Sequence, residues 1–379
     1  MRQTLSNARI VLADRTITGS VAIEDQTILA VGPEAGTDHG IDCDGDFLVP
    51  GIIDLHTDNI EHHLHPRPAV RWPSSLAAVL AHDWQVLGAG ITTVLDSLSI
   101  GDYDSKGQRG AMLDAAIDAI SQAKADGLLH SDHYFHFRCE LSDAALLDLV
   151  PRHMDNPALR LVSLMDHTPG QGQWHDVNIY REYRRKKSGY VWSDAEWDGY
   201  IAGRQAMQAL HVTPSRAWIA DAAKARATPM ASHDDTTPDD VERAHADAIA
   251  ISEFPTTPQA ARRARDLGMS IVMGAPNVVL GGSHSGNVSA LALADDGLLD
   301  ILTSDYVPAS MLHAAFVLAQ RGLELHDAIA MISARPAAIL GFADRGQIAP
   351  GLRADLLRVG VLDGLPVIKG IWVAGRKFM

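Results

Sequence analysis

From residue 48 onward, short apolar runs alternate with longer stretches rich in alanine and leucine. Each apolar run is too short for a helix and is typical of a buried strand, whereas the longer stretches have helical periodicity. The predicted strands cover residues 51–57, 91–96, 133–139, 161–166, 228–232, 248–252, 270–274 and 300–304. The predicted helices between them include 75–87, 110–125, 142–153, 239–246 and 258–267. Strands that alternate with helices indicate parallel βαβ units, so the pattern predicts an α/β fold.

The number and spacing of these units favour a closed (β/α)8 barrel of the TIM type, because eight of them fit within about 270 residues. An open, doubly wound sheet is the alternative. It is disfavoured because no GxGxxG motif follows an early strand. In a closed barrel, the functional residues lie at the C-terminal ends of the strands.

The two ends of the chain have a different pattern, in which short runs of valine and isoleucine are separated by turn residues. We predict that residues 1–47 and 345–379 together form a small β-sandwich domain, beside a barrel domain of residues 48–344. Within the barrel, residues 168–227 form a polar and aromatic insertion. Its basic run at 181–187 predicts either a solvated helix face or a lid that carries positive charge over an anionic substrate.

Composition limits the classes of function. The formal net charge of −15 over 379 residues argues against general affinity for nucleic acids, and it means that an anionic substrate needs a local basic or metal-bearing pocket. No apolar run is long enough to cross a membrane and no signal segment opens the chain, so we predict a cytoplasmic protein without a membrane partner. Cys43 and Cys139 are the only cysteines and lack zinc-ribbon spacing, so a structural disulfide is not expected.

Several predicted strands end in a residue that can bind a metal ion. His56 and Asp58 lie two positions apart at the end of the first strand, so their side chains point to the same face. Strands three, four, five and eight end in Glu140, His167, His233 and Asp305. Because these ends meet at one rim of a barrel, we predict a site for one or two divalent ions there.

Two of these carboxylates have further predicted roles. Glu140 is our candidate for a bridge that holds two ions apart. Asp305 is our candidate general base, because a carboxylate beside a water molecule that a metal has acidified can accept its proton.

Other features predict contacts to a phosphate-bearing substrate. Arg67 lies between two prolines, and a guanidinium binds phosphate oxygens in a bidentate manner, although a surface arginine is the alternative. The loop 281–287 is dense with small residues whose N–H groups and hydroxyls can surround phosphate, but it lacks the lysine of a P-loop and is equally consistent with an ordinary turn. Arg138 is either a substrate contact or the charge partner of Glu140. The predicted substrate-binding residues are Arg67, Arg138, Ser283, His284 and Asn287.

With these residues in place, the chain resembles the amidohydrolase superfamily. The resemblance rests on the PGIIDLH segment at 50–56, the GITTV segment at 90–94, the ADL-type return at 351–356 and Asp305 at the end of the eighth strand. It implies a metal-bearing (β/α)8 barrel with a small β-sandwich built from both chain ends.

The chain is most similar to one branch of this superfamily, which acts in phosphonate degradation. The shared motifs cover nearly the whole chain and lie at 56–59, 66–68, 138–141, 163–167, 232–235, 253–257, 274–277, 282–287 and 304–306. This resemblance implies metal-dependent hydrolysis of a ribose phosphonate 5-triphosphate to the 5-phosphate, with release of pyrophosphate. The expected partner is this small phosphorylated sugar phosphonate, and a homo-oligomer is compatible with the sequence.

The chain departs from the wider superfamily pattern at three strands. The first strand carries His-x-Asp where most members carry His-x-His, strand four has no lysine that could be carboxylated into a bridge, and strand six ends in Glu253 where many members have histidine. These changes make the predicted ligand set richer in oxygen, which favours zinc, manganese or magnesium.

Two other functions remain open at this point. The first is a cyclic amidase or deaminase that acts on a neutral ring, a reaction that does not need Arg67 or the 281–287 loop. The second is a barrel that has lost catalysis and serves as an interaction scaffold. The second is disfavoured because its expected sign is missing ligands, and this chain retains His56, Asp58, His233 and Asp305.

Overall fold

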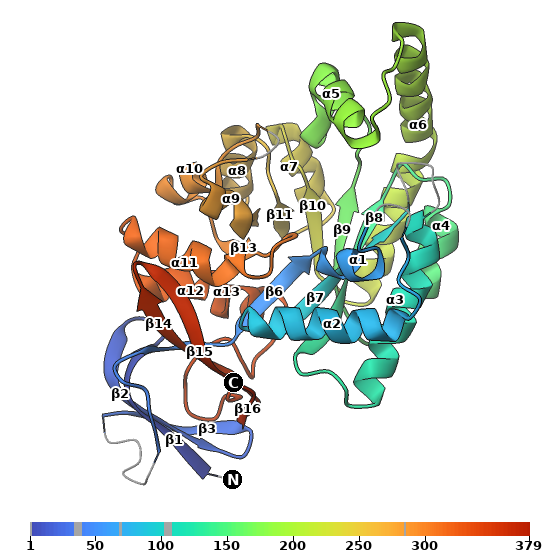
Figure 1. Cartoon of the computed structure of the whole chain (residues 1–379). Coiled ribbons are helices and arrows are strands. Elements are labelled where there is room, and N and C mark those ends of the chain that lie inside the picture. The colour runs from blue at the N-terminus through green and yellow to red at the C-terminus, as the bar shows by residue number, and fades with distance from the viewer. Residues whose placement is uncertain (1, 34–39, 68–69, 102–107, 284–285) are drawn as a thin grey trace.

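The computed structural model describes residues 2–33, 40–67, 70–101, 108–283 and 286–379, and it contains two separate sheets (Figure 1). One sheet has eight parallel strands that neighbour one another in chain order. Their bounds are β6 Ile52–Thr57, β7 Ile91–Ile100, β8 Asp132–Glu140, β9 Leu159–Met165, β10 Met230–His233, β11 Ile251–Glu253, β12 Ser270–Gly274 and β13 Ile301–Thr303. All eight predicted strands are present, with ends that differ from the predictions by a few residues.

The first and last strands of this sheet meet at its C-terminal rim. A parallel bridge pairs Thr57 with Asp305. The Asp305 N–H donates to the carbonyl of His56 at 3.0 Å, and the Asp58 N–H donates to the carbonyl of Asp305 at 2.6 Å. These bonds close the ring at the rim that carries the predicted metal ligands. The prediction of a barrel is therefore confirmed.

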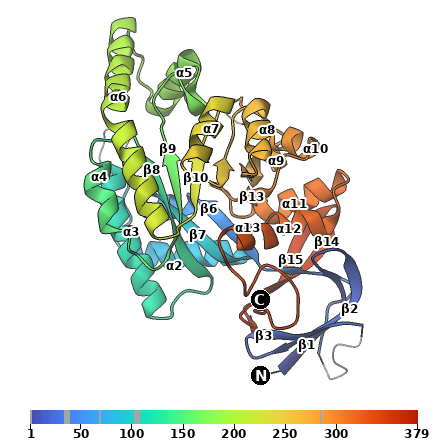
Figure 2. The same ribbon diagram turned by 180° about the vertical axis from the view of Figure 1, so that it is seen from behind.

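Helices lie around the outside of the barrel, as both views show (Figures 1 and 2). Their bounds are α1 Asn59–Leu64, α2 Ser75–Gly88, α3 Gln108–Ala125, α4 Leu146–Leu149, α7 Pro238–Ala246, α8 Pro258–Asp266, α9 Ala275–Leu280, α10 Ala290–Asp295, α11 Ser310–Gln320, α12 Leu325–Ala330 and α13 Ala334–Ile339. The predicted helix 142–153 is wrong over most of its length, because only α4 and a 3-10 turn at Val150–Arg152 form there. The Asp143 carboxylate instead accepts from the Ala145 N–H at 2.6 Å and holds a turn, and Pro151 has no N–H for a helical bond.

Aliphatic side chains fill the interior of the barrel. Because side chains alternate along a strand, every barrel strand can send one set inward and the other toward the helices. The inward cluster of buried residues comprises Ile53, Leu55, Leu95, Leu161, Ala231, Ile251, Val272 and Ile301, with Ala337 and Leu340 from the region of α13. This packed interior leaves the C-terminal rim as the place where polar side chains converge.

The second sheet joins both ends of the chain. Its hydrogen-bonded order is β16-β15-β14-β5-β1-β2-β3, and β4 pairs with β1. The bounds are β1 Arg2–Val11, β2 Thr16–Glu24, β3 Thr27–Gly32, β4 Ile41–Asp42, β5 Phe47–Pro50, β14 Leu356–Leu362, β15 Leu365–Val373 and β16 Arg376–Lys377. It has its own core, which includes Leu5, Ile10, Ile23, Leu48, Leu356 and Trp372. The predicted fold class, a barrel with a β unit from both termini, is confirmed; the exact domain boundaries stay a prediction.

The 168–227 segment contains two helices, α5 Val177–Ser188 and α6 Asp194–Ala225. The last turns of α6 join the main core through Ile219 and Ala223, so this part of α6 is the barrel helix between β9 and β10. Helix α5 and the first half of α6 project beyond the barrel, on the side away from the second sheet (Figures 1 and 2). A separate aromatic core around Trp174, Tyr180 and Trp197 holds this projection together.

Two arginines of the basic run on α5 form ion pairs within the projection. Arg181 lies 2.8 Å from the Asp194 carboxylate, and Arg185 forms an ion pair with Glu182 one helical turn away. These contacts agree with a solvated helix face, and the lid stays a prediction. In the part of the chain that is described, no helix combines the length and the apolar character that crossing a membrane requires.

Candidate metal centre and substrate pocket

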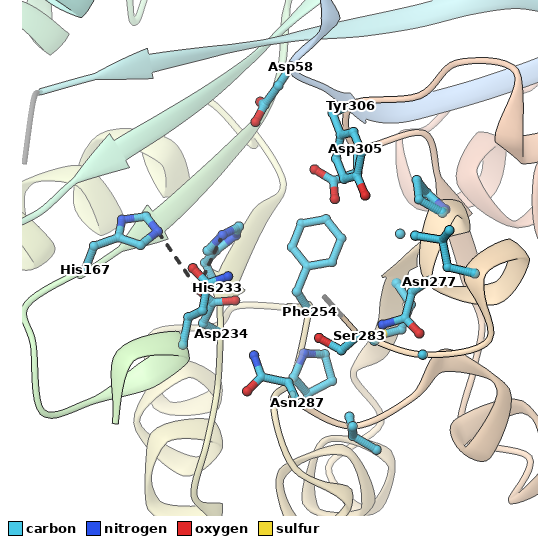
Figure 3. Close-up of a pocket in the computed structure, with 18 of the residues that line it drawn as sticks. Asp58, His167, His233, Asp234, Phe254, Asn277, Ser283, Asn287, Asp305 and Tyr306 are labelled. Carbon is cyan, nitrogen blue, oxygen red and sulfur yellow. Dashed lines mark ion pairs between the residues drawn. The ribbon is translucent and has the colours of Figure 1, made fainter. Parts of the chain in front are cut away.

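A cavity of about 260 Å³ lies at the C-terminal ends of the barrel strands. Figure 3 shows acidic and imidazole side chains along one side of it, and these come from the ends of β6, β9, β10 and β13. They are Asp58, His167, His233, Asp234 and Asp305. Four of these five were predicted from the sequence, and Asp234 was not assigned a role.

One group of possible metal donors consists of His56, Asp58 and Asp305, whose nearest donor atoms all lie within 4.8 Å of one another. Nε2 of His56 is buried, lies 3.5 Å from Asp58 Oδ1 and finds no hydrogen-bond partner among the described residues. Burial lowers the pKa of His56, but the charge of Glu253, the nearby Asp58 carboxylate and the hydrogen bond to Glu253 outweigh it and raise the pKa to about 10. A buried nitrogen without a partner, in a field that favours positive charge, fits a divalent cation.

A second group consists of His167, His233 and Asp234, whose donor atoms also lie within 4.8 Å of one another. Asp234 Oδ2 lies 3.9 Å from Nε2 of His167 and 3.7 Å from Nε2 of His233 (Figure 3). Two imidazoles and a carboxylate form a ligand set that zinc and manganese accept. The signal in the sequence was the His-Asp pair that ends β10, of which only the histidine was assigned.

Buried carboxylates lie behind the histidines of both groups. Glu140 Oε2 is 2.6 Å from Nδ1 of His167, and its other oxygen accepts from the His167 N–H and the Ser142 hydroxyl. Glu253 contacts Nδ1 of both His56 and His233, at 2.6 and 3.0 Å. Glu140 thus reaches the cavity through His167, which favours a positioning role over the predicted bridge between ions.

Asp305 is held in a distinct electrostatic environment. Burial and the neighbouring Asp58 carboxylate raise the pKa of Asp305 to about 6, against the opposing effect of His56. A carboxyl with a pKa near neutrality can both accept and release a proton under physiological conditions, which is what a general base requires.

Arg138 is buried beside the cavity and pairs with Asp58, not with Glu140. Its Nη1 atom lies 2.5 and 2.6 Å from the two carboxylate oxygens of Asp58. Although burial lowers the pKa of Arg138, the charge of Asp58 raises it above its ordinary value, so the guanidinium is charged. Arg138 lines the cavity, and its buried Nε finds no hydrogen-bond partner among the described residues. A phosphate oxygen is a suitable acceptor for such a group.

The opposite side of the cavity is more apolar and carries amide and hydroxyl groups (Figure 3). The lining of the cavity also includes the apolar residues Phe254, Pro255, Pro276, Leu280 and Val288, together with Asn277 and the predicted residues Ser283 and Asn287. Arg67 is exposed and is not among the residues that line the cavity, so its predicted contact to substrate remains untested. His284 lies outside the described residues.

Comparisons with known proteins decide the family. The sequence profile of the Amidohydrolase family matches residues 194–359. The chain is also 40% identical over 377 residues to alpha-D-ribose 1-methylphosphonate 5-triphosphate diphosphatase from Escherichia coli K12, covering 98% of this chain and 99% of that protein. This chain belongs to the amidohydrolase family.

Solved structures agree with the fold of this amidohydrolase. N-acetylglucosamine-6-phosphate deacetylase from Pasteurella multocida superimposes with a TM-score of 0.64 at 13% identity, over 100% of both chains. A 5-methylcytosine deaminase from Klebsiella pneumoniae gives a TM-score of 0.66 at 12% identity, over 100% of this chain and 98% of that one. At these identities the likeness concerns the architecture alone, because members of one fold catalyse different reactions.

Some of the left-handed backbone of this amidohydrolase lies at the rim that bears the cavity. Asp234, Phe254 and Asp305 follow β10, β11 and β13 and have φ angles of 58°, 54° and 56°. Left-handed backbone is unusual for residues other than glycine and especially so for a bulky one such as Phe254. The sequence gives no signal for this strain. The φ angles turn the chain sharply at the strand ends, where Asp234, Phe254 and Asp305 all line the cavity.

Proposed function

We propose that this chain hydrolyses alpha-D-ribose 1-methylphosphonate 5-triphosphate to the 5-phosphate and pyrophosphate, with one or two divalent ions as cofactor. The observation that carries the proposal is the 40% identity to the Escherichia coli diphosphatase over 98% of the chain. The site supports it, because residues of both donor groups line one cavity together with a charged arginine.

The donor set suggests how ions would be held. His56, Asp58 and Asp305 would hold one ion, and His167, His233 and Asp234 would hold a second. Zinc, manganese and magnesium are the candidates, since the ligands are imidazoles and carboxylates without thiolates. When bound, such an ion supplies neutralisation of the phosphoryl oxygens and acidification of a water molecule.

The remaining roles, proton transfer and substrate binding, belong to side chains of the protein. Asp305 accepts the proton of the attacking water at its carboxylate. Arg138 holds a phosphate oxygen through its guanidinium group, while its Nη1 stays on Asp58. Ser283 and Asn287 bind from the opposite wall, and we propose the same for His284 and Arg67.

The three cavity carboxylates, Asp58, Asp234 and Asp305, bear on the number of ions. A triphosphate is itself strongly anionic, so the substrate and this wall repel each other across a short distance. Two divalent cations would compensate the negative charge of the substrate and of the three carboxylates better than one cation. The two donor groups provide a place for each cation.

The competing proposal is a cyclic amidase or deaminase. Solved structures with this fold include a dihydropyrimidinase from Brevibacillus agri, at 14% identity and a TM-score of 0.59, but that likeness shows the fold alone. The amide-bearing, partly apolar wall of the cavity is compatible with a ring substrate. The charged Arg138 beside the donor groups favours an anionic one.

Phosphorus NMR of metal-reconstituted protein with the ribose 5-triphosphate tests the proposal, with an EDTA-treated sample as control. We expect pyrophosphate to appear only with metal present. In ¹⁸O-labelled water, the label in the 5-phosphate or in the pyrophosphate reports which phosphorus is attacked. Release of single orthophosphate would contradict the diphosphatase assignment. No turnover by metal-loaded protein, together with hydrolysis of a dihydropyrimidine ring, would favour the amidase.

Replacing Arg67 with alanine is expected mainly to raise KM, by about tenfold, and to leave kcat within twofold. A contact made equally in the ground state and the transition state affects binding alone, and a charge-assisted hydrogen bond contributes about 1.5 kcal/mol or more. Steady-state kinetics with the triphosphate substrate measure both constants. An unchanged KM would identify Arg67 as a surface residue, in keeping with its exposure.

A further inference from the structure

Glu253 lies at the centre of a buried hydrogen-bond network that links its own strand, β11, to three other strands of the barrel. The side chain is fully buried at the end of β11. Oε1 lies 2.6 Å from Nδ1 of His56 on β6, and Oε2 lies 3.0 Å from Nδ1 of His233 on β10. Oε2 also accepts from the Ser163 hydroxyl on β9 at 2.9 Å. One carboxylate thus contacts a histidine from each of the two donor groups.

From this geometry we infer that Glu253 is a positioning residue shared by both donor groups, which fixes His56 and His233 as Nδ1–H tautomers with Nε2 directed toward the metal. Strand six then contributes no ligand of its own in this protein. The inference deepens the proposed function and rests on its metal dependence.

Direct ligation by Glu253 fits the structure less well. Both of its oxygens already accept hydrogen bonds, and it is not among the residues that line the cavity. Nε2 of His56 lacks a partner among the described residues, whereas Nδ1 of the same ring is engaged by Glu253. A metal-binding imidazole commonly donates its other ring N–H to a carboxylate, which sets its tautomer and its basicity.

The network continues beyond Glu253 to β8. Ser163 has one hydroxyl proton and gives it to Glu253, and its oxygen also lies 2.5 Å from Nε2 of His136. Nδ1 of His136 faces the Leu55 carbonyl at 3.0 Å and the Ser97 hydroxyl at 3.1 Å. Nδ1 of His56 and Nδ1 of His233 both face Glu253, and because an ionised carboxylate only accepts, both rings carry a proton at Nδ1.

The decisive substitution is Glu253→Gln, which keeps the shape but replaces one acceptor oxygen by an NH2 donor. An NH2 group that faces Nδ1 of His56 or His233 forces that ring to move its proton to Nε2, where it blocks the metal. We expect the affinity for zinc, measured by chelator competition on the metal-free protein, to fall by about 10- to 100-fold. In ¹⁵N-histidine spectra at saturating zinc, the wild-type protein should show Nδ1–H signals for both rings, and the variant should lose at least one.

The matched control is Asp235→Asn. Asp235 is a buried carboxylate next to the same strand ends, but it accepts from the hydroxyls of Ser232 and Ser252 at 2.5 and 2.6 Å and contacts no imidazole among the described residues. We expect it to leave zinc affinity and the histidine signals unchanged. If Glu253→Gln fails to fold, Ser163→Ala still tests the network, because loss of one hydrogen bond to Glu253 should weaken zinc binding by about two- to tenfold.

Unchanged zinc affinity in Glu253→Gln, or in the Ser163→Ala variant where the first does not fold, would overturn the inference. Nδ1–H signals that persist for both rings in Glu253→Gln would also overturn it, since they would mean that Glu253 does not set the tautomers. All of these measurements use zinc alone. Their outcome is therefore independent of whether the triphosphate proves to be the substrate.

Discussion

Replacing Asp305 with asparagine is expected to lower kcat by about 10²- to 10⁴-fold and to leave the metal-free protein folded. Asparagine preserves the shape but cannot accept the proton of the attacking water. The metal-free protein should become no less stable, because burial and Asp58 raise the pKa of Asp305 to about 6 from its ordinary 3.8. A carboxyl group whose pKa is higher in the folded than in the unfolded state destabilises the folded protein at any pH above its folded-state pKa. For Asp305 this destabilisation is roughly 3 kcal/mol. Pyrophosphate release and the unfolding of EDTA-treated protein near pH 7.5 measure the two effects.

Asp300→Asn provides the matched control, since this aspartate precedes the opposite end of the same strand. Its carboxylate lies 2.8 Å from both the Arg265 guanidinium and the Ile271 N–H. The same chemical change there should lower stability and leave kcat unchanged. Activity within tenfold of wild type in Asp305→Asn would remove Asp305 from the role of base and make Asp234, another carboxylate that lines the cavity, the next candidate.

The features of the fold that were predictable are those that local pattern determines. The strands β6 to β13 were visible as short runs rich in apolar residues, because each is largely buried on both faces. The helix predicted at 142–153 was wrong for a local reason as well. The polar start of this segment favours a turn, and helix propensity does not include the hydrogen bond from the Ala145 N–H to Asp143 that competes with the helix. The barrel helix at the end of α6 was hidden, because it continues a longer helix that leaves the barrel.

The site residues that could be predicted are those for which the residue type and its position at a strand end suffice for an assignment. His56, Asp58, His167, His233 and Asp305 were assigned in this way, because the ends of parallel strands converge in any barrel. Distinguishing a ligand from the carboxylate behind it needs distances between strands that are far apart in sequence. From the sequence alone, Glu140 and Glu253 cannot be distinguished from Asp305, because all three are carboxylates at strand ends. Only the contacts of Glu140 and Glu253 with histidine Nδ1 atoms show the difference.

A second cluster of titratable groups had no signal at all, because its members are scattered over α2, β7 and β8. The buried Asp96 carboxylate lies 2.7 Å from Nε2 of His82 and 2.8 Å from Nδ1 of His133. Asp83 contacts Nε2 of His133 at 3.3 Å and Nδ1 of His130 at 2.5 Å. This network ties a covering helix to the barrel wall and, being fully hydrogen-bonded, offers no vacant donor for a metal.

Asp96→Asn is therefore expected to lower the free energy of unfolding by about 3 to 5 kcal/mol, because it leaves a buried imidazolium without its counter-charge. The pH dependence should change as well. Burial lowers the pKa of His133, but the charge of Asp96 outweighs it and raises the pKa to about 9 from 6.5. The stability from this group is fully present below pH 6.5 and is lost as the pH rises toward 9. Urea titrations from pH 6 to 9 should show this loss in the wild-type protein and a flatter profile in the variant.

At acidic pH the stability from this network changes with pH in the opposite direction, which offers a further check. Burial raises the pKa of Asp96, but His133 and His82 outweigh it and hold the pKa below its ordinary 3.8, so its contribution is present above that value and is lost as the pH falls further. Asp114→Asn is the control, because Asp114 forms the same kind of pair with His153 at 2.9 Å but its side chain is 59% exposed. Such a pair contributes at most about 1 kcal/mol. An Asp96→Asn variant that loses no more stability than Asp114→Asn would show that water or backbone movement compensates the buried charge, and that the network is not what holds α2 to the wall.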